Sequence, residues 1–129
     1  MNKTTFGNSC LSLRSGIHYP QLASNYAGRI ADSGVAGTVT NLYLTQITQD
    51  YYGNISGHLD GLYLPGPFTG TISKKGDLNF TMKITVGLLV VQGSIKVGGE
   101  LQGTFKVVDP QGNSLGEYGV WSADPPKLS

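Results

Sequence analysis

The chain has 129 residues, the size of a single domain with one hydrophobic core. Only 13% of the residues are charged, against roughly 25% in an average soluble domain, while the 19 glycines are about twice the usual share. This composition excludes a helical bundle or coiled coil, and a hydrophobic content of 39% argues against disorder. The formal net charge of +1 gives no field that would attract nucleic acid, so we expect no nucleic-acid partner.

Residues 1–25 have no clear hydrophobic period, so we expect an irregular N-terminal arm. This segment also has no unbroken apolar stretch and does not have the pattern of a signal peptide. The longest apolar run, 88–91, is far shorter than the ~20 residues that cross a bilayer, so we expect no membrane insertion. The expected location is the cytoplasm for the chain as given, or outside it if the chain belongs to a longer anchored protein.

From residue 26 onward, apolar and polar residues alternate with a period of two, which is typical of half-buried β-strands. The pattern is clearest at 78–84, where the apolar residues share one face and the polar residues the other. Turn sequences rich in Gly, Asp and Pro separate these runs at hairpin length. We expect strands near 26–32, 37–47, 51–59, 67–73, 78–84, 88–96, 100–108 and 116–122.

A five-residue pattern, apolar-x-Gly-x-apolar, recurs in these runs and places a glycine in the middle of an apolar strand face. Glycine inside a strand loses chain entropy and packs nothing, so its presence needs a reason. A missing side chain on the concave face lets a strand bend sharply, as it must when a small sheet closes on itself. The pattern is centred on Gly28, Gly57, Gly70, Gly93 and Gly103.

The expected fold class is therefore all-β, an eight-stranded antiparallel meander β-barrel with an irregular N-terminal arm. Closure would pair 26–32 with 116–122 and leave no exposed sheet edge. The barrel domain would span 26–124, with the arm at 1–25 and a C-terminal tail at 125–129.

Residues that carry catalysis or bind metals are few. Cys10 is the only cysteine, and His18 and His58 are the only histidines, so we expect no zinc site, no Cys/His pair and no cofactor. His58 and Asp60 would form an orienting hydrogen bond for acid-base work, although an exposed histidine beside a turn aspartate is the plainer interpretation. No catalytic residue is predicted.

Three further charged residues allow more than one interpretation. Arg29 and Asp32 either bind an anion or, more commonly, form a surface ion pair. Glu117 would carry chemistry only if it pointed into the barrel.

Aromatic residues occur on nearly every expected strand, and several must converge in a barrel about one side chain wide. Buried tyrosines need partners for their hydroxyl groups, which each other, water or a ligand can supply. Two interpretations stay open: a filled core, or a cavity at one mouth that holds a small apolar or aromatic ligand. The candidate ligand-binding residues are Tyr43, Tyr52, Tyr63, Phe80, Phe105, Tyr118 and Trp121.

The run 88–91 is apolar on both strand faces, so Leu88 and Val90 should face outward if Leu89 and Val91 point inward. Burial of the outer pair would require contact with the N-terminal arm or with another copy in a homo-oligomer. The alternative is a pair of isolated exposed apolar side chains.

Four segments occur in a characteristic order: 22–30, ending in Tyr-Ala-Gly-Arg-Ile; Asn-Ile-Ser-Gly at 54–57; Gly-Pro-Phe-Thr-Gly-Thr-Ile at 66–72; and Gly-Glu-Tyr-Gly-Val-Trp at 116–121. Together they resemble a small glycine-rich β domain of bacteria that is often attached to the C-terminal side of serine/threonine protein kinases. The resemblance covers 22–121 and departs from the usual threonine at Arg29 and Val120. It implies a bacterial source and an accessory sensing or binding role, and its motifs are structural.

By architecture alone, the expected barrel is also similar to ligand-binding barrels of the avidin and lipocalin kind. We therefore expect a non-enzymatic module that binds a small ligand or a partner at one open end. The alternative is a barrel cyclase or isomerase in which one Tyr, Glu or His acts as acid or base on an apolar substrate in the barrel cavity.

Overall fold

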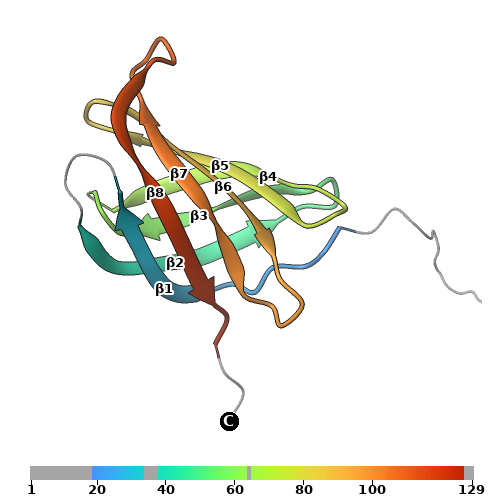
Figure 1. Ribbon diagram of the computed structural model, residues 1–129. Helices are drawn as coiled ribbons and strands as arrows, with labels where there is room; N and C mark the ends of the chain where they lie inside the picture. The colour runs from blue at the N-terminus through green and yellow to red at the C-terminus, as the bar shows by residue number, and fades with distance from the viewer. Residues whose placement is uncertain (1–18, 34–37, 64, 127–129) are drawn as a thin grey trace, which may run out of the picture.

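The computed structural model describes residues 19–33, 38–63 and 65–126. These residues form a closed barrel of eight antiparallel strands in chain order (Figure 1), which confirms the expected fold class. The expected arm falls largely on residues 1–18, which lie outside the described part of the chain. The strands are β1 (Tyr26–Asp32), β2 (Val39–Gln49), β3 (Asn54–Asp60), β4 (Gly66–Ile72), β5 (Asp77–Ile84), β6 (Gly87–Ile95), β7 (Leu101–Val108) and β8 (Ser114–Asp124).

Pairing of the first and last strands closes the barrel, as expected. Ile30 lies opposite Trp121 in this pair, and Ala27 lies opposite Asp124, so the start of β1 and the end of β8 are neighbours. The described ranges contain no helix long and apolar enough to cross a bilayer.

The interior of the barrel is filled by side chains from every strand. The rings of Phe68 and Phe80 lie 4.6 Å apart between centroids, and Trp121 meets Phe80 edge-on at 6.1 Å. Of the two interpretations left open by the sequence, the structure shows the filled core. The buried cluster comprises Tyr26, Ile30, Leu42, Leu44, Ile55, Leu59, Phe68, Ile72, Leu78, Phe80, Met82, Leu89, Val91, Leu101, Phe105, Val107, Trp121 and Ala123.

Glycines allow neighbouring strands to approach more closely than a side chain would permit. A Cβ atom on Gly28 would overlap the carbonyl oxygen of Ser122, and one on Gly103 would overlap that of Gln92. The obstacle at both positions is the backbone of the adjacent strand. The glycines are therefore needed for strand contact at the sharp bends of a small barrel.

Residues 19–25 cover one end of the barrel without forming a strand. The side-chain amide of Gln49 fastens them: its Oε1 accepts a hydrogen bond from the Leu22 N–H at 3.0 Å, and its Nε2 donates to the Pro20 carbonyl at 2.8 Å. Tyr19 and Leu22 are partly buried against the core. This part of the chain thus closes the end at which β1 begins and β8 ends (Figure 1).

We expect Gly103→Ala to destabilise the barrel by about 3 kcal/mol, because the added methyl group cannot fit without moving β6 away from β7. The matched control is Gly98→Ala in the turn between the same two strands, where an added Cβ has no neighbouring atom within 4 Å. Urea unfolding monitored by Trp121 fluorescence measures both. Equal stability of the two variants would contradict the proposed role of the glycine.

Candidate ligand-binding groove

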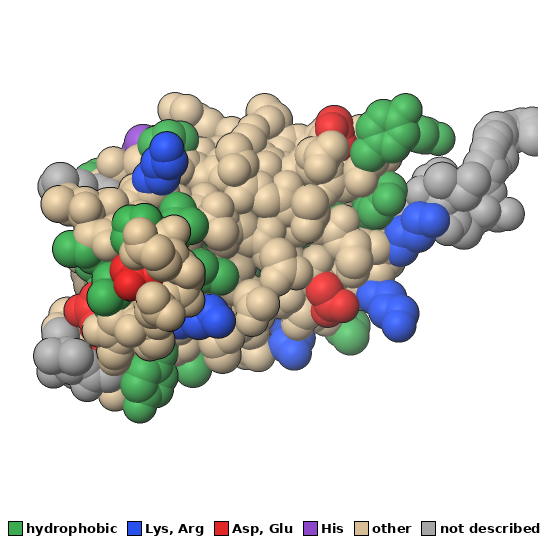
Figure 2. Space-filling model, turned by 90° about the horizontal axis from the view of Figure 1, so that it is seen from above, with side chains coloured by type: hydrophobic (Ala, Val, Ile, Leu, Met, Phe, Trp, Pro, Cys, Tyr) green, Lys and Arg blue, Asp and Glu red, His purple; other side chains and the backbone are tan. Residues whose placement is uncertain are grey.

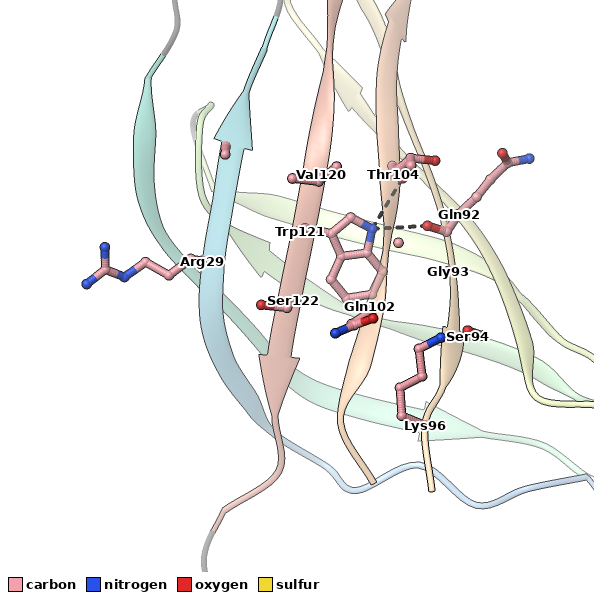
Figure 3. A pocket seen from close by; sticks show the side chains of 12 residues that line it. Arg29, Gln92, Gly93, Ser94, Lys96, Gln102, Thr104, Val120, Trp121 and Ser122 are labelled. Carbon is pink, nitrogen blue, oxygen red and sulfur yellow. Dashed lines mark hydrogen bonds between the residues drawn. The ribbon is translucent and has the colours of Figure 1, made fainter. Parts of the chain in front are cut away.

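A groove of about 660 Å³ crosses the outer face of β6, β7, β8 and β1. Two rows of outward-facing residues, each continuous across the four strands through the pairing register, form most of its lining (Figure 3). Because the rows lie two residues apart along each strand, they stand on the same face of the sheet. One row is Arg29, Ser122, Gln102 and Ser94, and the other is Ala31, Val120, Thr104 and Gln92.

The floor between the two rows is formed largely by glycine backbone with an indole ring behind it. Trp121 lies opposite Gly103, which in turn lies opposite Gly93. The indole Nε1–H donates to the carbonyl oxygens of Gln92 at 3.1 Å and Thr104 at 3.2 Å (Figure 3). A Cβ on Gly93 would come within 2.7 Å of the indole Cζ2. The two glycines therefore provide the space in which Trp121 reaches across β7 to β6.

Positive charge and neutral hydrogen-bonding groups dominate the lining. Of the described residues that line the groove, Arg29 and Lys96 are cationic and none is acidic. Figure 3 shows Lys96, which follows β6, at one end of the groove and Arg29 extending outward at the β1 edge. Such a lining can hold a ligand that carries negative charge together with hydrogen-bonding groups.

Figure 2 shows one face on which uncharged polar side chains and backbone cover the middle, with charged and hydrophobic side chains mostly toward the two ends. In the described part of the chain, no three residues of the types His, Cys, Asp and Glu gather where they could hold a metal ion.

A second polar feature lies at the end of the barrel away from residues 19–25. Tyr63 follows β3, and its hydroxyl donates a hydrogen bond to the carboxylate of Glu117 on β8. Both side chains are half-buried. Burial, together with the neighbouring carboxylates of Glu117 and Asp32, raises the pKa of Tyr63 well above its ordinary value. Glu117 thus does not simply point to solvent, and it serves as the acceptor for a tyrosine hydroxyl.

The predicted ligand-binding residues do not all come together. Phe80, Phe105 and Trp121 are buried in the core, whereas Tyr63 lies half-buried at the barrel mouth. Several of the aromatic side chains thus converge in the barrel, as expected, and the other three do not. Tyr43, Tyr52 and Tyr118 are exposed at 44%, 74% and 55%.

Strand alternation explains two of these exposed positions. Tyr43 lies between the inward-facing Leu42 and Leu44, and Tyr118 lies beside the inward-facing Gly119, so both point outward. Tyr52 lies in a turn that the sequence assigned to the start of a strand, since β3 begins at Asn54.

Other expectations have mixed outcomes. Leu89 and Val91 are buried, and Leu88 and Val90 are half-buried on the outer face; contact of Leu88 and Val90 with another copy stays a prediction.

Arg29 and Asp32 lie three residues apart in β1, which places their side chains on opposite faces of the sheet. His58 and Asp60 share the outer face of β3.

The sequence did not single out the polar residues of the groove. Gln92, Ser94, Gln102 and Ser122 have the pattern of an ordinary solvated strand face, and only the strand register brings them into rows. The one feature of the sequence that could have indicated the groove is the pair Gly93 and Gly103. These glycines lie opposite each other on β6 and β7 and form part of the groove floor.

Comparison with protein-family models, with curated proteins and with solved structures finds no match for this chain. The functional argument therefore depends on the geometry of the groove and on the chemistry of its lining.

The stability of the barrel should fall as the pH rises above about 10, since the unfolded state then ionises a tyrosine that the folded state keeps protonated. A difference of one bound proton between the folded and unfolded states changes the free energy of unfolding by about 1.4 kcal/mol per pH unit, and this is the most that the half-exposed Tyr63 should contribute. Tyr63→Phe should therefore lose stability less steeply than the wild type.

Urea unfolding at several values between about pH 9 and 11 measures this slope. The slope that remains in Tyr63→Phe reports Tyr26, whose pKa is also raised by burial. Tyr118→Phe, which removes the hydroxyl of an exposed tyrosine, is the matched control. A Tyr63→Phe slope equal to that of the wild type would contradict the prediction.

Proposed function

We propose that this domain is a non-enzymatic binding module whose ligand lies in the outer groove across β6, β7, β8 and β1. The observation that carries the proposal is the contrast between a side-chain-filled interior and an open groove of about 660 Å³ on the outer face. A ligand inside the barrel would have to displace core side chains such as Phe80 and Trp121, at a cost of several kcal/mol. The outer groove is already formed and requires no such change.

The chemistry of the lining supports binding over catalysis. Its polar side chains are amides, hydroxyls, a guanidinium and an ammonium group, as in Gln92, Ser122, Arg29 and Lys96. Such groups ordinarily do not exchange protons near neutral pH, which is what general acid-base catalysis needs. They do form hydrogen bonds and ion pairs, which are sufficient to hold a ligand.

The proposed occupant is an extended acidic peptide segment of a partner protein. The rows cross four strands, which span about 14 Å at a spacing of ~4.8 Å. An extended chain of about four residues covers that length. Side-chain amides such as those of Gln92 and Gln102 can donate to and accept from peptide groups, while Arg29 and Lys96 can pair with carboxylates.

The test uses a hexaglutamate peptide, with hexalysine as the comparison. Trp121 is the only tryptophan in the chain and lines the groove, so its fluorescence and its indole N–H resonance report occupancy directly. We expect hexaglutamate to shift both signals and hexalysine to shift neither. Arg29→Gln/Lys96→Gln should weaken binding by up to about tenfold, because two ion pairs at exposed sites are lost.

The control is Lys83→Gln/Lys106→Gln, which removes the same charge at positions outside the groove lining. Equal weakening by both double variants would show nonspecific charge attraction and overturn the proposal. An unchanged Trp121 signal with millimolar hexaglutamate would overturn it as well.

A further inference from the structure

Two turns of the barrel share one sequence pattern and one set of hydrogen bonds. Residues 50–54 read Asp-Tyr-Tyr-Gly-Asn, and residues 109–113 read Asp-Pro-Gln-Gly-Asn. In each, the aspartate Oδ1 accepts hydrogen bonds from the backbone N–H groups two and four positions later, at 2.8 and 2.9 Å in the first turn and at 2.9 Å for both in the second. The glycine has a positive φ in both, 84° and 92°.

The shared bonds identify the positions that the turn needs, namely the aspartate, the glycine and the asparagine. The two positions between aspartate and glycine are Tyr51 and Tyr52 in one turn and Pro110 and Gln111 in the other. The tyrosines are therefore not required by the turn, although they are 73% and 74% exposed. Their rings lie 5.6 Å apart between centroids with planes at 87°. Two aromatic rings held in solvent on a well-bonded turn indicate a contact surface.

Tyr52 also lines an open groove of about 460 Å³ at the end of the barrel covered by residues 19–25. Tyr19 belongs to the same lining, where the Nζ of Lys74 lies 5.9 Å from its ring centroid. Aromatic faces and hydrogen-bonding groups therefore occur side by side. The polar residues of this lining are Ser73, Lys74, Lys75 and Asp77.

Sugar rings have CH groups on their faces and hydroxyl groups at their edges, so they fit aromatic side chains that lie beside hydrogen-bonding groups. The charges in the lining are nearly balanced, with two lysines and one aspartate, which gives little attraction for a polyanion such as nucleic acid. On the other side of the turn, the lining on the outer face of β2, β3 and β4 has hydroxyl groups at Thr48, Ser56 and Thr69 and a single charged residue, Asp50. We propose that Tyr51, Tyr52 and the Tyr19 groove form a binding site for a neutral saccharide chain. This site is separate from the outer groove and independent of its proposed function.

The turn at 109–113 supplies the sequence for the test variant. Tyr51→Pro/Tyr52→Gln gives the first turn the sequence of the second, so the backbone bonds are retained while both rings are removed. The reciprocal control, Pro110→Tyr/Gln111→Tyr, places two rings on the second turn, at the other end of the barrel. The probes are soluble hexasaccharides of glucose in β-1,4, β-1,3 and α-1,4 linkage and of N-acetylglucosamine in β-1,4 linkage, titrated while amide resonances are recorded.

We expect at least one hexasaccharide to bind at millimolar or lower concentration and to shift the resonances of Tyr19, Tyr52 and Ser73. Tyr51→Pro/Tyr52→Gln should weaken this binding at least tenfold, while the reciprocal variant should bind as the wild type does. If the exchanged turn impairs folding, Tyr51→Ala/Tyr52→Ala should show the same loss. The proposal would be overturned if none of the four hexasaccharides shifted the amide resonances, or if the variants that lack the two rings bound as tightly as the wild type. The Trp121 response to hexaglutamate should be unchanged throughout, which separates this site from the outer groove.

Discussion

Close approach of backbone to backbone at glycine positions is the constraint on which this barrel depends. A sheet of eight strands closes around an interior only about one side chain wide, so its strands must bend strongly. At Gly28 and Gly103 the carbonyl oxygen of the neighbouring strand occupies the space that a Cβ would need. Closure, the filled core and the thin floor of the outer groove all depend on these contacts.

Trp121 links the core to the outer groove. Its ring packs edge-on against Phe80 inside, and its N–H is shared by two backbone carbonyls on β6 and β7. Each neutral hydrogen bond of this kind contributes about 1 kcal/mol, and the indole also fills the space left by Gly93 and Gly103. The groove floor is therefore fixed without a ligand, and such a floor would lower the entropic cost of the proposed binding.

Alternation and glycine spacing were sufficient to predict the architecture. The pattern at 78–84 became β5, and the pattern around Gly28 became the strand that closes against β8. The turn at 50–54 was harder, because Tyr51 and Tyr52 have high β propensity, while the hydrogen bonds of the Asp50 side chain decide the local structure.

Site residues were less predictable than strands. Side chains along a strand point alternately inward and outward, and this alternation places Tyr43 and Tyr118 on the outer face. Their residue type alone would suggest burial, since aromatic side chains are buried more often than polar ones. Gln46 adds a difficulty of its own: it has a φ of 54°, and the register of β2 against β3 shifts beside it, which changes which side chains face inward. The rows of the groove depend on register across four strands, which one sequence does not specify.

The adjacent ends of β1 and β8 have a mechanical consequence. Ala27 lies opposite Asp124 in an antiparallel pair, so tension applied through the two ends of the chain acts at one point of the sheet. Once residues 19–25 detach, the applied force acts on one hydrogen-bonded residue pair at a time, and β1 separates from β8 pair by pair. Shearing, by contrast, would load all the bonds of the pair together. Tension applied at these two ends would therefore open the barrel along the pair of strands by which it closes.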